Sequence, residues 1–300
     1  MKKKTYLFAL MAMVLTLGSC SDNENGIGGE TSKYITVSTS IGNMTRVATD
    51  AKGGQTFEEG DEISVYAWTG APTVAPETSE RVVNNAINKL TNGSWVSTPQ
   101  MLWKNNREKH YFIGVYPTAA ISDLSAGEYT FDVNKQTESD LLVAVNKDGL
   151  SYNVDEQQPV PLTFTHVMAK LAVNLTYKNQ WGGIPTVEKV VVGNAAKEAT
   201  INYLTKVVTP STTAKEDFSL PEITENTKYV SVIIPQEEVT QLTIVIGGKN
   251  FVYDNGTPFK LESGKITTVN LEVGRDEIKL GDVKITNWED GSTFSGEALN

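Results

Sequence analysis

The sequence predicts an all-β protein made of two tandem β-sandwich domains, and three observations support this fold class. Thr, Val, Ile and Tyr recur throughout the 300 residues, and 24 glycines supply turns, a composition typical of strands. A dozen or more short segments alternate apolar and polar residues with a period of two, and no segment shows a sustained helical period. At about 100–150 residues per domain, the length fits two such domains.

The N-terminal half contains five clear candidate strands. They lie at residues 35–41, 63–68, 110–116, 129–133 and 141–145. Phe57-Glu58-Glu59-Gly60-Asp61 has the residue types of a turn and leads into the second of these strands. Pro117 ends the third, because proline has no N–H to donate to a sheet.

The C-terminal half resumes the alternation after the proline-containing segment 157–161, which is the best candidate for a domain junction. Its candidate strands lie at residues 171–177, 187–192, 199–204, 229–234, 242–246, 251–253, 266–273 and 278–288. Gly247-Gly248-Lys249-Asn250 reads as a hairpin loop. We therefore expect an N-terminal sandwich over residues 34–158 and a C-terminal sandwich over residues 159–300.

The first 33 residues have the pattern of an export signal followed by a tether. Three lysines after Met1 precede an uncharged apolar run, and Leu17-Gly18-Ser19 leads into Cys20, the one cysteine of the chain. This pattern resembles the lipobox of bacterial lipoproteins, and the alternative is an ordinary signal peptide with an incidental cysteine. We expect residues 1–19 to be removed, Cys20 to be acylated, and residues 20–33 to tether the chain to the outer membrane.

Charge and motifs exclude several classes of function. The net charge of -10 disfavours nucleic acid as a partner, because like charges repel. The two histidines, His110 and His166, are far apart and Cys20 lies outside the predicted fold, so zinc is unsupported. No phosphate-binding loop, dinucleotide fingerprint or nucleophile elbow occurs. We expect no enzymatic activity, no cofactor and no metal site.

An ordered series of motifs resembles the fimbrillin family, the type V, FimA-like and Mfa-like surface lipoproteins of Bacteroides-type Gram-negative bacteria. The motifs, in chain order, are Met44-Thr45-Arg46, Phe57 to Ala67, Trp103, Tyr111 to Pro117, Asp140 to Ala144, Leu162 to Leu171 and Ile285-Thr286-Asn287-Trp288. Together with the lipobox they cover nearly the whole chain. The resemblance implies two transthyretin-like, Greek-key sandwiches, assembly into cell-surface fimbriae as a stalk, tip or anchor subunit, and no enzyme activity.

The resemblance also implies an assembly mechanism. A trypsin-like protease would cut the precursor after an arginine, and Arg46-Val47 is the candidate bond because it follows the first strand; the alternative is an ordinary exposed loop arginine. Loss of that strand would leave an apolar groove for a strand of another pilin subunit. The candidate donor is the C-terminal segment, where Ile278 and Leu280 alternate, Gly281-Asp282 breaks the phase as a hairpin or bulge would, and Val283 and Ile285 resume it.

The sequence leaves other functions open. The main alternative is a surface glycan-binding lipoprotein, in which some of the five tryptophans would stack on sugar rings; coplanar exposed tryptophans would favour it, and buried ones would favour the pilin. A glycoside hydrolase would need two converging carboxylates, and 36 acidic residues make a chance pair uninformative. A ligand on a host or bacterial surface is a further expected partner, which the sequence does not identify.

Overall fold

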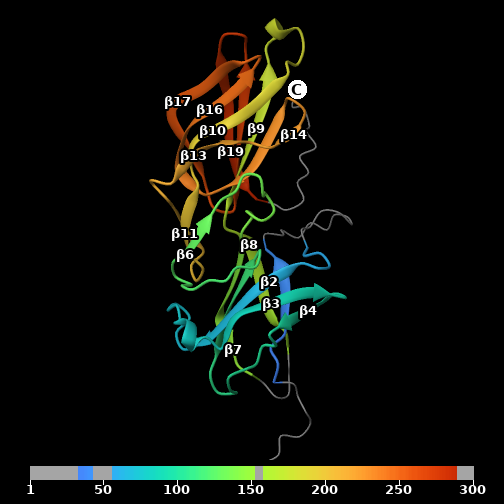
Figure 1. Cartoon of the computed structure of the whole chain (residues 1–300), viewed down its shortest axis with the longest axis vertical. Helices are drawn as coiled ribbons and strands as arrows, with labels where there is room; N and C mark the ends of the chain where they lie inside the picture. The colour runs from blue at the N-terminus through green and yellow to red at the C-terminus, as the bar shows by residue number, and fades with distance from the viewer. Residues whose placement is uncertain (1–32, 43–55, 153–157, 289–300) are drawn as a thin grey trace, which may run out of the picture. The chain divides into compact units, whose positions relative to one another are not determined.

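The computed structural model describes residues 33–42, 56–152 and 158–288, and these residues form an all-β fold. Four sheets contain nineteen strands, and the helical elements of this part of the chain are two short 3₁₀ turns, η1 (Thr78–Glu80) and η2 (Asn179–Trp181) (Figure 1). No helix within the described ranges is long and apolar enough to cross a membrane. The predicted all-β class is confirmed, and the division into two tandem sandwiches stays a prediction.

The largest sheet has seven strands and is built mainly from the N-terminal half. Its order is β1 (Val37–Ile41), β8 (Val160–His166), β7 (Leu142–Leu150), β5 (His110–Tyr116), β2 (Glu62–Thr69), β3 (Val83–Thr91) and β4 (Ser94–Thr98). All pairs are antiparallel except β1 and β8, which run parallel. The first and last strands of this order, β1 and β4, are its edges.

Two sheets are built from the C-terminal half. The five-stranded sheet has the order β14 (Glu222–Thr224), β15 (Lys228–Ile233), β9 (Ala169–Tyr177), β18 (Lys265–Val273) and β19 (Ile278–Asn287). The four-stranded sheet has the order β13 (Lys215–Ser219), β10 (Val187–Ala196), β16 (Gln236–Ile246) and β17 (Lys249–Leu261). The Gly247-Gly248 hairpin joins β16 to β17 as predicted.

A small third sheet joins strands from the two halves of the sequence. Its order is β12 (Val207–Pro210), β11 (Glu198–Asn202) and β6 (Gly127–Thr130), and Figure 1 shows β6 beside β11. In addition, β8 pairs with β7, although β8 follows the predicted junction in the sequence and β7 precedes that junction. Backbone pairing therefore crosses the proposed boundary at 158/159, and the division into two domains at that point stays a prediction.

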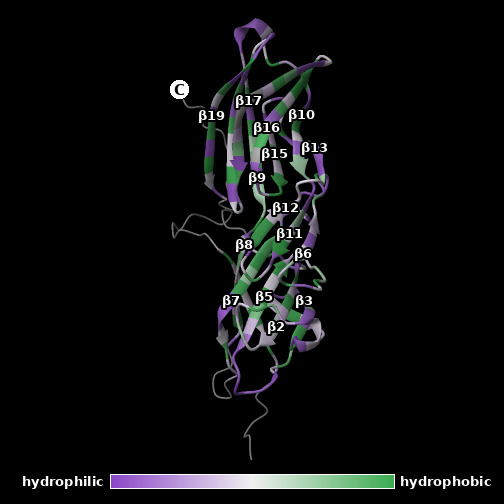
Figure 2. Cartoon of the chain, turned by 90° about the vertical axis from the view of Figure 1, so that its left-hand side faces the viewer, coloured by the Kyte–Doolittle hydropathy of each residue, from purple (hydrophilic) through white to green (hydrophobic). Residues whose placement is uncertain are grey.

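The centre of the seven-stranded sheet is buried on both faces at β2, which explains the continuous apolar run of that strand. Ile63, Val65 and Ala67 belong to one buried cluster, whereas Tyr66 and Trp68 belong to a second, larger one. Because side chains alternate across a strand, a run that is apolar at every position must be covered on both sides. The smaller cluster includes the core-facing residues of β1, and the larger one extends through the C-terminal sheets, with hydrophobic residues running along β11 and β16 (Figure 2).

Candidate assembly surfaces

The edge strand β1 is held by backbone hydrogen bonds on both of its sides near its start. On one side it pairs with β8, and the N–H of Val160 donates to the carbonyl of Thr36 at 2.8 Å. On the other side the N–H of Ile35 donates to the carbonyl of Met101 at 2.9 Å. The residues that lead into β1 are therefore bonded to the segment that follows β4, whereas β1 itself is the edge strand and pairs with β8.

The side chains of residues 35–41, which are β1 and the two residues before it, alternate between the core and solvent, as the sequence predicts. Ile35 and Val37 are only 2% and 6% exposed and belong to the smaller buried cluster. Thr39 and Ile41 are half-buried, and the Nε1–H of Trp95 donates to the Thr39 hydroxyl at 3.0 Å. Removal of β1 would expose the apolar side chains beneath it, since no other described strand covers that part of the cluster.

Phe57 closes the same core at the end of β1. Its ring makes edge-on contacts with Trp95, Tyr116 and Phe164, with centroid separations of 5.3, 5.4 and 5.1 Å. Such edge-to-face pairs are a favoured aromatic geometry. The sequence indicated only a turn at 57–61, because the contacts come from strands far away along the chain.

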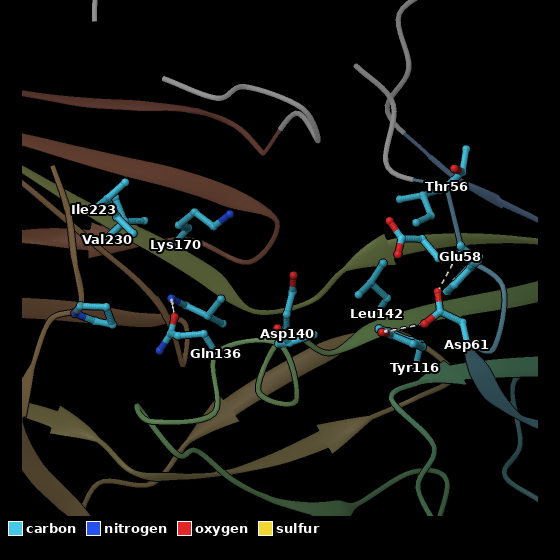
Figure 3. A pocket seen from close by; sticks show the side chains of 15 residues that line it. Thr56, Glu58, Asp61, Tyr116, Gln136, Asp140, Leu142, Lys170, Ile223 and Val230 are labelled. Atoms are coloured by element: carbon cyan, nitrogen blue, oxygen red, sulfur yellow. Dashed lines mark hydrogen bonds between the residues drawn. The ribbon is translucent and has the colours of Figure 1, made fainter. Parts of the chain in front are cut away.

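A pocket of about 550 Å³ opens directly beyond Ile41 (Figure 3). Its apolar lining comes from Ile41, Phe57, Leu142, Pro221, Ile223, Val230 and Val232. Its polar lining comes from Thr56, Glu58, Asp61, Tyr116, Gln136, Thr137, Asp140 and Lys170. Figure 3 shows Ile223, Val230 and Lys170 on one side, Glu58, Asp61 and Tyr116 on the other, and Asp140 between them. We call this cavity the Ile223 pocket.

Hydrogen bonds fix the polar walls of the Ile223 pocket. The Tyr116 hydroxyl donates to Asp61 Oδ1 at 3.4 Å, and burial followed by the charge of Asp61 raises the pKa of that phenol. Gln136 Nε2 donates to the Ser231 hydroxyl at 3.0 Å, and the Val232 N–H donates to Gln136 Oε1 at 2.6 Å. With these groups in place, the pocket combines an apolar lining with carboxylates that accept hydrogen bonds.

The predicted donor residues all lie on β19, the edge strand of the five-stranded sheet. In the pairing with β18, Ile278, Leu280, Val283 and Ile285 oppose Val273, Leu271, Val269 and Thr267. The register shifts between Leu280 and Asp282, so the phase break of the sequence is a β-bulge at Gly281. Because directly paired residues point to the same face, the bulge keeps all four apolar side chains on one face of the sheet.

The two ends of β19 differ in burial. Ile278 and Leu280 pack against the larger buried cluster, whereas Val283 and Ile285 are 37% and 40% exposed. The strand then ends beside Trp288, which is only 3% exposed. Thus the N-terminal end of β19 is packed against the core, and the rest of the strand is exposed up to Trp288.

The indole ring of Trp288 contacts the side chains of His166 and Lys170. Its ring stacks on His166 with a centroid separation of 3.9 Å and an interplanar angle of 6°, and Lys170 Nζ lies 4.1 Å from the ring centroid. His166 Nδ1 is in turn 2.7 Å from Asp140 Oδ1. The sequence placed Trp288 in a motif but gave no sign of these partners.

The remaining predicted residues that the structure describes do not converge on a reactive site. Cys20, Arg46 and Val47 lie outside the described residues. Trp68 and Trp288 are buried, and Trp95, Trp103 and Trp181 are half-buried, the arrangement expected to favour the pilin over the glycan-binding alternative. Within the ranges that the structure describes, no group of three or more His, Cys, Asp or Glu side chains could hold a metal ion.

These features define an all-β protein whose N-terminal edge strand packs on its core and whose C-terminal edge strand carries an apolar face. The chain belongs to the fimbrillin-like family, which matches residues 45–288. No curated protein matches the chain.

Solved structures with the same fold come from Bacteroides and Porphyromonas species. A Bacteroides uniformis protein, provisionally described as a cell adhesion protein, matches with a TM-score of 0.64 and 18% identity over 86% of this chain and 100% of its own. A similarly described Bacteroides ovatus protein matches with a TM-score of 0.60 and 17% identity, over 85% of this chain and 96% of its own. The tip fimbrial protein Mfa3 of Porphyromonas gingivalis, with a C-terminal truncation, matches with a TM-score of 0.50 and 11% identity. The match covers 79% of this chain and 97% of that one. At these identities the similarity establishes the fold.

Proposed function

We propose that this protein is a structural subunit of cell-surface fimbriae that assembles by protease-triggered strand exchange and takes part in adhesion. Membership of the fimbrillin-like family is the observation that carries this proposal. The fold shared with the tip fimbrial protein Mfa3 is in accord with it. We assign no reaction, cofactor or metal to the protein; its expected partners are other pilin subunits, the activating protease and a surface ligand.

The geometry of β1 supports the proposed exchange. Cleavage between Arg46 and Val47 would leave β1 held only by non-covalent contacts, since Arg46 follows that strand in the chain. Before the cut, the covalent link gives β1 a high effective concentration and blocks the groove. After the cut, a strand of another subunit could replace β1, bury its apolar residues in the groove and pair with β8. The contact is head-to-tail, so its repetition produces a filament.

The first experiment tests the cleavage site. Treatment of the purified precursor with an arginine-specific, trypsin-like protease should produce higher oligomers from the wild type and not from Arg46→Ala. Arg107→Ala is the matched control, because the Arg107 side chain is exposed and its loss should leave assembly unchanged. The strand-exchange mechanism is wrong if the cut wild type stays monomeric, or if Arg46→Ala polymerises equally well.

The second experiment tests the anchor. We propose that Cys20 is acylated and attaches the precursor to the outer membrane, because acyl chains contribute about 0.8 kcal/mol per buried methylene to membrane binding. Cys20→Ala should move the protein from the detergent phase to the aqueous phase in a phase-partition assay. Continued partition of Cys20→Ala into detergent would exclude a lipid anchor at this position.

A further inference from the structure

Three exposed apolar side chains lie close to the point where the folded chain begins. Tyr34 pairs with Leu102 in an isolated antiparallel β-bridge, and the N–H of Trp103 donates to the carbonyl of Lys33 at 3.1 Å. Leu102, Trp103 and Val74 line one open pocket of about 780 Å³. Tyr34, Val74 and Leu102 are 42%, 62% and 49% exposed. We call the surface formed by these three side chains the Tyr34 patch.

The segment beside the Tyr34 patch is basic, although the chain as a whole has a net charge of -10. The basic side chains here are Lys33, Lys104, Arg107 and Lys109, and the acidic ones are Glu80, Glu108 and Asp148. Lys104 and Glu108 form an ion pair at 3.4 Å, whereas Lys33 and Arg107 form none with the residues that the structure describes. The patch therefore has a small positive excess at its edge, and its apolar side chains offer most of the contact.

We propose that the Tyr34 patch docks on the lipid surface of the outer membrane while the precursor is anchored through Cys20. The inference rests on the lipid anchor proposed above and adds the face that the folded chain turns toward the membrane. Lys33 follows Cys20 by 13 residues, so even a fully extended chain keeps it within roughly 45 Å of the anchor. A docking face at Lys33 is thus presented to the lipid at a high effective concentration.

The side chains of the patch have the chemistry of a membrane–water interface. A tyrosine ring has an apolar body and a polar tip, which suits the headgroup region. The exposed parts of Val74 and Leu102 gain from burial among the acyl chains. Lysine and arginine side chains at the edge can lay their apolar stems on the same surface and reach the lipid phosphates.

Docking through this patch would keep the candidate cleavage segment accessible. The strand β1 leads away from Tyr34, and Ile41 at its end lies six residues beyond Ile35, about 20 Å along an extended strand. The chain enters the segment that contains Arg46 at that far end. A membrane-docked precursor would thus present this segment to the activating protease from the side away from the lipid.

The first test measures how the chain without its predicted signal segment, and with Cys20→Ala, binds to vesicles of phosphatidylcholine mixed with phosphatidylglycerol. The double variant Val74→Asp, Leu102→Asp should bind at least about tenfold more weakly in a sedimentation assay, because two apolar contacts are lost. Ile184→Asp is the matched control, since Ile184 is 63% exposed and does not line that pocket. Lys33→Ala should weaken binding about fivefold, and only where phosphatidylglycerol is present.

The second test attaches the wild-type chain to the same vesicles through Cys20, by addition of its thiol to a maleimide lipid. Trypsin should then cut after Arg107 at least about fivefold more slowly than in the free chain, because the tethered patch is docked most of the time. Cleavage after Arg275, which is exposed outside the patch, should keep its rate, and the double variant should lose the protection of Arg107.

Three results would overturn the membrane assignment. These are equal sedimentation of the wild type and the double variant, equal cleavage after Arg107 in the tethered and free chains, and a dimer in solution that the double variant dissociates. The last result would assign the patch to a second copy of the chain. The anchor itself is judged separately by the phase partition of Cys20→Ala, so a failed anchor and a failed docking face are distinguishable.

Discussion

Substitution of Ile35 by alanine tests whether the segment 35–41, which ends in β1, is part of the core or only lies on it. Ile35 is 2% exposed and belongs to the smaller buried cluster. Truncation of a buried isoleucine costs about 2–5 kcal/mol, and we expect about 2–3 because an edge strand can partly collapse into the cavity. A loss of 2 kcal/mol corresponds to roughly thirtyfold more frequent opening of the strand.

The assay combines urea unfolding with amide hydrogen exchange of residues 35–41. Thr36→Ala is the control, because the Thr36 side chain is exposed and the substitution should change stability by less than about 0.5 kcal/mol. If Ile35→Ala is no more destabilising than Thr36→Ala, and the β1 amides exchange at the wild-type rate, then β1 does not fill the core and its removal would not create an acceptor groove.

Three further predictions concern other parts of the structure. Gly114→Ala should destabilise the protein by about 1–3 kcal/mol in urea unfolding, because the new Cβ would lie 2.6 Å from Phe164 Cζ; the exposed substitution Ser38→Ala should have little effect. Burial lowers the pKa of His110 below its usual 6.5, so the unfolded state binds more protons than the folded state near that pH. The free energy of unfolding should therefore fall as the pH is lowered through 6.5. His110→Gln should reduce this pH dependence relative to the wild type. Gly248→Val should cost about 1–2 kcal/mol, because Gly248 has φ +71 in the hairpin between β16 and β17, and an unchanged melting temperature would show that the turn rearranges.

The sequence by itself determined most strands and two local irregularities. Alternation at 35–41 and 171–177 predicted β1 and β9, since a half-buried strand needs a period of two. Adjacent glycines predicted the turn at 247–248, because both take the positive φ that such a hairpin requires. The break at Gly281 predicted a bulge as one of two explanations, because one extra residue shifts the phase of every side chain after it.

Tertiary structure alone decided which segments meet. The pairing of β6 with β11, the contact of Phe57 with Phe164, and the stacking of Trp288 on His166 all join residues that are far apart in the sequence. A local pattern states that a side chain must be buried but not which partner buries it, because that choice depends on the packing of the whole chain. For the same reason, the composition of segment 157–161 indicated a domain junction but not which sheet the next strand joins. The pairing of β8 with β7 places that strand in the seven-stranded sheet.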